Sequence, residues 1–113
     1  MPERSGRTVV LRDERHGRDS RHLEAYLDAA GGLHVDGRDL GPGTAVVSGD
    51  GEYEWRTIVR REHLSQLVAV LGGDEGADVL DVLEQWYTGP AAYEFEEVLS
   101  GGAVPIERSS YAG

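Results

Sequence analysis

The chain has 113 residues, of which 39% are hydrophobic and 28% are charged, so it can build a folded core and is not a globally disordered protein. It contains no cysteine, which excludes disulfides, thiolate nucleophiles and cysteine-based metal sites. The formal net charge of −10 repels the phosphate backbone and disfavours direct binding of nucleic acid.

The charge is unevenly distributed along the chain. Residues 1–21 hold six arginines and four acids, a net charge of +2, whereas residues 62–107 hold ten acids and neither lysine nor arginine. An acidic half of this kind favours a basic protein as partner. The alternative is that the acidity only keeps a small protein in solution.

The N-terminal residues 1–21 are expected to form an Arg-rich, partly mobile segment, followed by a single α+β domain over 22–113. Within this segment only residues 8–11 have the pattern of a short strand, and residues 13–20 are expected to form a loop. No apolar run suits an export signal or a membrane span, so we expect a cytoplasmic protein that does not bind membranes.

Alternating and β-prone segments predict the strands. The first pair covers residues 22–28 and 33–35 and forms a hairpin over the glycines between them. Residues 37–43 are expected to be a loop, and residues 44–47 a further strand. The clearest strand, 53–60, places on one face Tyr53, Trp55, Thr57 and Val59.

Three helices follow from apolar residues at helical spacing. The first covers residues 62–71 and stops at Gly72-Gly73. The second has Asp74 as its predicted N-cap and buries Val79, Leu80, Val82, Leu83 and Trp86. The third begins at Pro90, and a last strand covers 104–109. The order β-β-β-β-α-α-α-β predicts an α+β fold, with a mainly antiparallel sheet of four to five strands packed on one face by about three helices.

No motif in the sequence indicates catalysis. The four histidines lack the spacing of a metal site, and no nucleophile elbow, dinucleotide fingerprint or P-loop is present. We therefore expect no catalytic, metal-binding or cofactor-binding residues. One alternative is a small enzyme or ligand-binding domain whose pocket, between sheet and helices, is lined by Glu54, Trp55 and Arg56.

The preferred hypothesis is a non-enzymatic protein-binding domain with an acidic helical face. Aromatic residues beside acids are typical of interfaces in which a few anchors sit inside a charged rim. The candidate partner-binding residues are Asp78, Asp81, Glu84, Trp86, Tyr87, Glu94 and Glu97. A further alternative is a structural or self-associating module that pairs an exposed strand edge with a second copy.

The chain also resembles a group of small, uncharacterised, acidic bacterial proteins over roughly residues 22–109. The resemblance lies in Glu52-Tyr53-Glu54-Trp55, Val70-Leu71-Gly72-Gly73-Asp74 and Val79-Leu80-Asp81-Val82-Leu83. Such proteins are similar in size, acidity and lack of catalytic motifs to immunity proteins, which neutralise secreted toxins by plugging, for example, a nuclease's basic active site. The resemblance implies a toxin-neutralising immunity or inhibitor protein.

Overall fold

A computed structural model describes residues 4–41 and 52–112. Its elements follow the predicted order, which confirms the α+β fold class. The elements are β1 (Arg4–His16), β2 (Asp19–Asp28), β3 (Leu33–Leu40), β4 (Glu52–Val59), the 3-10 turn η1 (Arg61–His63), α2 (Leu64–Val70), α3 (Val79–Trp86), the 3-10 turn η2 (Gly89–Ala91), α4 (Ala92–Ser100) and β5 (Glu107–Ala112).

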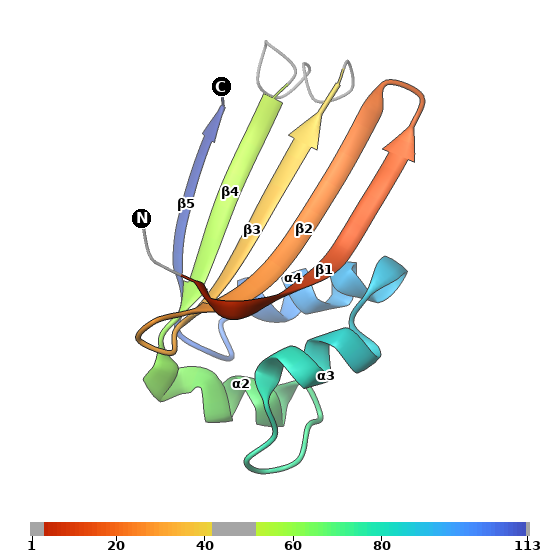
Figure 1. Ribbon diagram of the computed structural model, residues 1–113. Helices are drawn as coiled ribbons and strands as arrows, with labels where there is room; N and C mark the ends of the chain where they lie inside the picture. The colour runs from red at the N-terminus through yellow and green to blue at the C-terminus, as the bar shows by residue number, and fades with distance from the viewer. Residues whose placement is uncertain (1–3, 42–51, 113) are drawn as a thin grey trace.

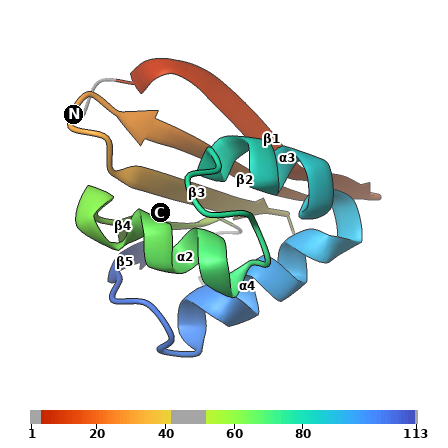
Figure 2. The same ribbon diagram turned by 90° about the horizontal axis from the view of Figure 1, so that it is seen from below.

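The five strands form one antiparallel sheet in the order β1-β2-β3-β4-β5. The helices gather at one end of the sheet, and the strands extend beyond them at the other end (Figure 1). Seen from below, α2, α3 and α4 lie together on one face (Figure 2). The fold is therefore two-layered, with a helical layer that covers only part of the sheet.

The N-terminal segment is more regular than its sequence suggests. Strand β1 has 13 residues and pairs with β2 as far as His16 opposite Asp19. The loop predicted over 13–20 was wrong except at the turn, where Gly17 has a φ of 65° that suits glycine. The polar residues 12–16 show no apolar alternation, so the sequence did not predict this part of the strand. Backbone pairing with β2 stabilises it. The β1–β2 pairing also crosses the boundary that we expected at residue 21.

Two predicted element boundaries were wrong. Strand β3 continues through residues 37–40, which were predicted to be a loop, and β5 begins at Glu107 instead of residue 104. Gly37 belongs to the strand because it lies opposite Trp55: a Cβ atom at residue 37 would lie 2.1 Å from the Trp55 ring. The strand predicted over 44–47 lies outside the described residues.

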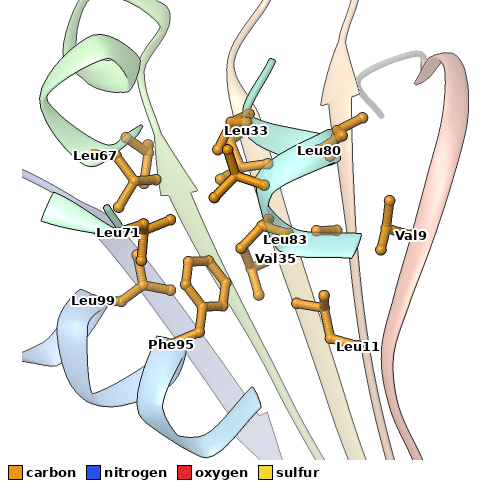
Figure 3. Close-up of a cluster of buried hydrophobic side chains, with 14 of the residues drawn as sticks. Val9, Leu11, Leu33, Val35, Leu67, Leu71, Leu80, Leu83, Phe95 and Leu99 are labelled. Carbon is orange, nitrogen blue, oxygen red and sulfur yellow. The ribbon is translucent and has the colours of Figure 1, made fainter. Parts of the chain in front are cut away.

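The core lies between the sheet and the helical layer (Figure 3). Phe95 at its centre is fully buried. The same buried cluster includes side chains from four strands and three helices: Val9, Leu11, Leu23, Leu33, Val35, Val59, Leu67, Leu71, Leu80, Leu83 and Leu99. The prediction that Tyr53, Trp55, Thr57 and Val59 share one face of β4 is confirmed: Tyr53 is partly buried against the core, and the other three are buried.

The ends of α3 differ from the prediction. The N-cap is Asp78, not Asp74, because the Asp78 side chain accepts a hydrogen bond from the Leu80 N–H (2.8 Å). Trp86 is 48% exposed, although we predicted that it would be buried. Tyr87 takes the inner position instead: its ring lies 6.2 Å from that of Phe95, and its hydroxyl donates to the Leu71 carbonyl (3.0 Å).

Candidate functional site

The outer side of the helical layer is acidic. Of the ten acids in residues 62–107, only Glu96 is not exposed. We call the following set the acidic helical surface: Asp74, Glu75, Asp78, Asp81, Glu84, Glu94 and Glu97. All five of the predicted partner-binding acids belong to it, and Asp74 and Glu75 from the α2–α3 loop extend it.

Two of these acids already have a partner within the chain. Arg7 of β1 forms ion pairs with Asp81 and, at 3.0 Å, with Glu84 on α3. The hydrogen bond to Asp81 is the main cause that raises the pKa of Arg7 above its ordinary value. The contact fastens α3 to the edge strand, so Asp81 and Glu84 are partly neutralised.

The remaining acids of this surface are less engaged. Among the described residues, no ion pair involves Asp74, Glu75, Glu94 or Glu97. All four are exposed, so within the described part of the chain their charges face solvent without an ion-pair partner, which is the arrangement that attracts a basic surface.

Exposed apolar side chains accompany the acids. Trp86 is 48% exposed, Val70 43% and Tyr93 39%. Val70 is the last residue of α2 and Trp86 the last residue of α3. The residues that follow them, Leu71 and Tyr87, are hydrogen-bonded to each other, so the C-terminal ends of the two helices lie close together. Of the predicted aromatic anchors, Trp86 is accessible, whereas Tyr87 is half-buried in the core.

A hollow of about 250 Å³ opens between α2 and the start of α3. Its apolar lining comes from β2, α2 and the residues before and in α3: Leu27, Leu64, Val68, Ala77 and Val79. The exposed Ser65 and Asp78 stand at its border. The sequence did not indicate this hollow, because Leu27 is brought to α2 and α3 only by the packing of the helices on the sheet.

A polar cluster fastens α4 to the sheet on the helix-facing side. Arg12 of β1 is only 3% exposed and donates a hydrogen bond to Glu96 of α4. Its guanidinium lies over the Tyr93 ring, 3.8 Å from the centroid, and the Tyr93 hydroxyl donates to Glu14 Oε1 (2.7 Å). An ion pair, a cation–π contact and a hydrogen bond thus converge on one helix.

A bulge in β1 is what turns Arg12 inward. Val10 pairs with Glu24 and Arg12 with Leu23, so Leu11 is the extra residue. Strict alternation would have placed Leu11 and Arg12 on opposite faces, but both are buried. The bulge therefore adds a charge to the helix-facing side that the sequence pattern assigns to the other face.

Asp39 completes this cluster from β3. Burial raises the pKa of the Asp39 carboxyl above its ordinary value, and it outweighs the opposing charges of Arg21 and Arg12. Its Oδ1 atom makes no hydrogen bond among the described residues. Arg21 has a raised pKa because it is hydrogen-bonded to Tyr93 and lies near Asp39. The cluster is densely connected, and its evident role is to hold α4.

The pocket lining that we predicted from β4 does not exist as a unit. Trp55 faces the helices and stacks on Tyr53, whereas Glu54 and Arg56 face away from them, as alternation along β4 requires. Glu54 pairs with Arg38 (3.3 Å), and Arg56 makes a two-point contact with Asp36. Opposite faces of one strand cannot line one pocket between sheet and helices.

The second polar group of the sheet surrounds Asp28 at the β2–β3 turn. Asp28 accepts hydrogen bonds from the backbone N–H groups of Ala30 and Gly32 and contacts His34 Nε2 at 2.7 Å. His34 stacks on Tyr26, with ring centroids 5.0 Å apart. Burial raises the pKa of Asp28, but the hydrogen bonds from His34, Gly32 and Ala30 outweigh it, so that the pKa lies below its ordinary value.

Within the described ranges, no cluster of three or more histidine, aspartate or glutamate side chains has the geometry to hold a metal ion. No described helix has both the length and the apolar character to cross a membrane. Comparison with protein-family models, curated proteins and solved structures finds no match for the chain. The function must therefore be inferred from the surface described above.

Proposed function

We propose that this chain is a non-enzymatic protein-binding domain that docks its acidic helical surface onto a basic protein, as a toxin-neutralising immunity or inhibitor protein does. One observation carries the proposal. On the helical layer, acids that form no ion pair among the described residues occur together with an indole that is 48% exposed. A charged surface with an aromatic anchor is the usual composition of a protein interface.

The charge distribution supports fast and selective association. The ten acids of residues 62–107 lie in a stretch without lysine or arginine. Arginines from elsewhere in the chain pair with four of them, Asp81, Glu84, Glu96 and Glu107, and the potentials of the other acids add. Potentials of one sign steer an oppositely charged partner into contact and fall with ionic strength. Trp86 would then supply the apolar contact that holds the complex.

The test is the binding of a basic protein recovered from the source cell's lysate at low salt, purified, and measured against matched variants. Glu94→Gln/Glu97→Gln removes two acids from the helical surface, and Glu52→Gln/Glu54→Gln removes two from the sheet. Both variants change the net charge from −10 to −8. Only the helical pair should slow association several-fold and weaken its salt dependence.

Two results would contradict the proposal. Equal association rates for the two double variants would show that the helical surface is not the contact. Wild-type affinity of the Trp86→Ala variant would show that Trp86 does not anchor the complex, since an indole at the centre of an interface contributes about 2 kcal/mol or more. The melting temperature of each variant controls for unfolding.

A second candidate is self-association through the two edge strands of the sheet, β1 and β5. Among the described residues, no strand pairs with the outer edge of β1 or of β5. Such edges can pair with a second copy. Light scattering over a range of concentrations separates the candidates: a dimer that persists at high salt favours edge pairing, and a monomer favours the acidic surface.

A further inference from the structure

The hollow beside α2 and α3 has the size and lining of a side-chain site. Its volume of about 250 Å³ is below the roughly 300–1,000 Å³ of small-molecule pockets, yet large enough for one apolar side chain. Val68 and Val79, each 4% exposed, are its most deeply buried lining residues, and half-buried Leu27, Leu64 and Ala77 complete the lining.

The border of the hollow is acidic. Asp78 stands at its edge, and Asp74 and Glu75 precede it in the same loop. The N-terminus of α3, whose partial positive charge would otherwise favour an anion, is already capped by Asp78 Oδ1. Apolar lining with an acidic border matches an apolar side chain flanked by lysine or arginine.

The walls of the hollow are held in place by close helix packing. A Cβ atom at Gly73 would lie 2.8 Å from Val68 Cγ1 and 2.9 Å from Val82 Cγ2. Only a glycine lets α2 and α3 approach this closely, so Val68 and the start of α3 keep their relative positions. A preformed site lowers the cost of ordering on binding.

We infer that this hollow receives one aliphatic side chain from a basic segment of the partner, with the flanking positive charges meeting Asp74, Glu75 and Asp78. The inference rests on the proposed function above and names the chemistry that the acidic helical surface would recognise. The partner is thus expected to present a leucine-like residue between basic residues, and not a uniformly basic surface.

The test uses two short peptides, one with a leucine between lysines and one with a serine in its place. Both are titrated at low salt into ¹⁵N-labelled protein. We expect the leucine peptide to bind about tenfold more tightly, which corresponds to about 1.4 kcal/mol, and to shift the amide resonances of residues 64–68 and 76–80. Ser65→Phe places a ring at the border of the hollow and should abolish this preference.

Ser100→Phe is the matched control, since it adds the same ring to an exposed serine on α4 that does not line the hollow. If both peptides bind equally and Ser65→Phe changes neither affinity, the hollow is not the site, although the acidic surface still binds. If neither peptide binds, the inference is wrong, whereas the proposed function is decided by the separate binding test with the basic protein. If Ser65→Phe instead turns a dimer into a monomer in sedimentation, the occupant is a second copy, and the inference is wrong.

Discussion

Replacing the half-buried Glu96 of α4 by glutamine should destabilise the protein more than a substitution of an exposed helix residue does. Arg12, its partner, is 3% exposed, so its charge needs a nearby carboxylate. Losing one partner of a fully buried ion pair costs about 3–5 kcal/mol. Here Glu96 keeps 26% exposure, and Glu14 Oε1 remains 3.9 Å from Arg12 Nε. We therefore expect a loss of about 2 kcal/mol, near the value of a hydrogen bond to a charged group.

The assay is urea unfolding followed by tryptophan fluorescence, and the control is Glu97→Gln on the next residue of α4. Both variants remove one charge, but Glu97 is exposed and should change the free energy of unfolding by no more than about 0.5 kcal/mol. The two variants should share the wild-type m-value. Equal midpoints for Glu96→Gln and Glu97→Gln would refute the idea that the buried Arg12 charge depends on Glu96.

Three other outcomes are expected. Gly37→Ala should lower the free energy of unfolding by about 1–3 kcal/mol, because its Cβ would lie 2.1 Å from the Trp55 ring; a wild-type urea midpoint would contradict this close packing. The pKa of Asp28 is lowered in the folded state, so its stabilisation is present above the ordinary value of 3.8 and is lost as the pH falls through the folded pKa. Asp28→Asn should therefore be less stable at neutral pH and lose less stability on acidification, and parallel pH profiles would count against this role. The pKa of Asp39 is raised, so its ionisation opposes folding as the pH rises above 3.8; Asp39→Asn should be more stable than wild type at pH 7, with the difference closing in acid, and thermal unfolding at both pH values checks the sign.

The acidic surface was largely predictable, because exposure of charged residues follows from the cost of burying them. Glu94 and Glu97 are exposed as the sequence indicated. What could not be predicted is which acids are engaged within the chain. Asp81 pairs with Arg7, which lies 74 residues away in the sequence. A local sequence pattern cannot predict a contact at that separation.

The sequence by itself determined the element types and the core stripe of each helix. Apolar residues at helical spacing identified Leu67 and Leu71 in the first helix and Leu80 and Leu83 in the second, all of which are buried. Alternation identified the buried face of β4. These features are local, since the period of side chains along a helix or strand depends on its own backbone geometry.

Only the tertiary structure decided which side chains are buried at the end of α3 and at the bulge in β1. Trp86 lies on the apolar stripe of α3 but is exposed, because Tyr87 fills the space beside Phe95. Arg12 is buried because a bulge turns β1 inward and α4 supplies Glu96. In both cases the outcome depends on competition for space and on charges brought from distant parts of the chain, and neither is contained in the periodicity of a single segment.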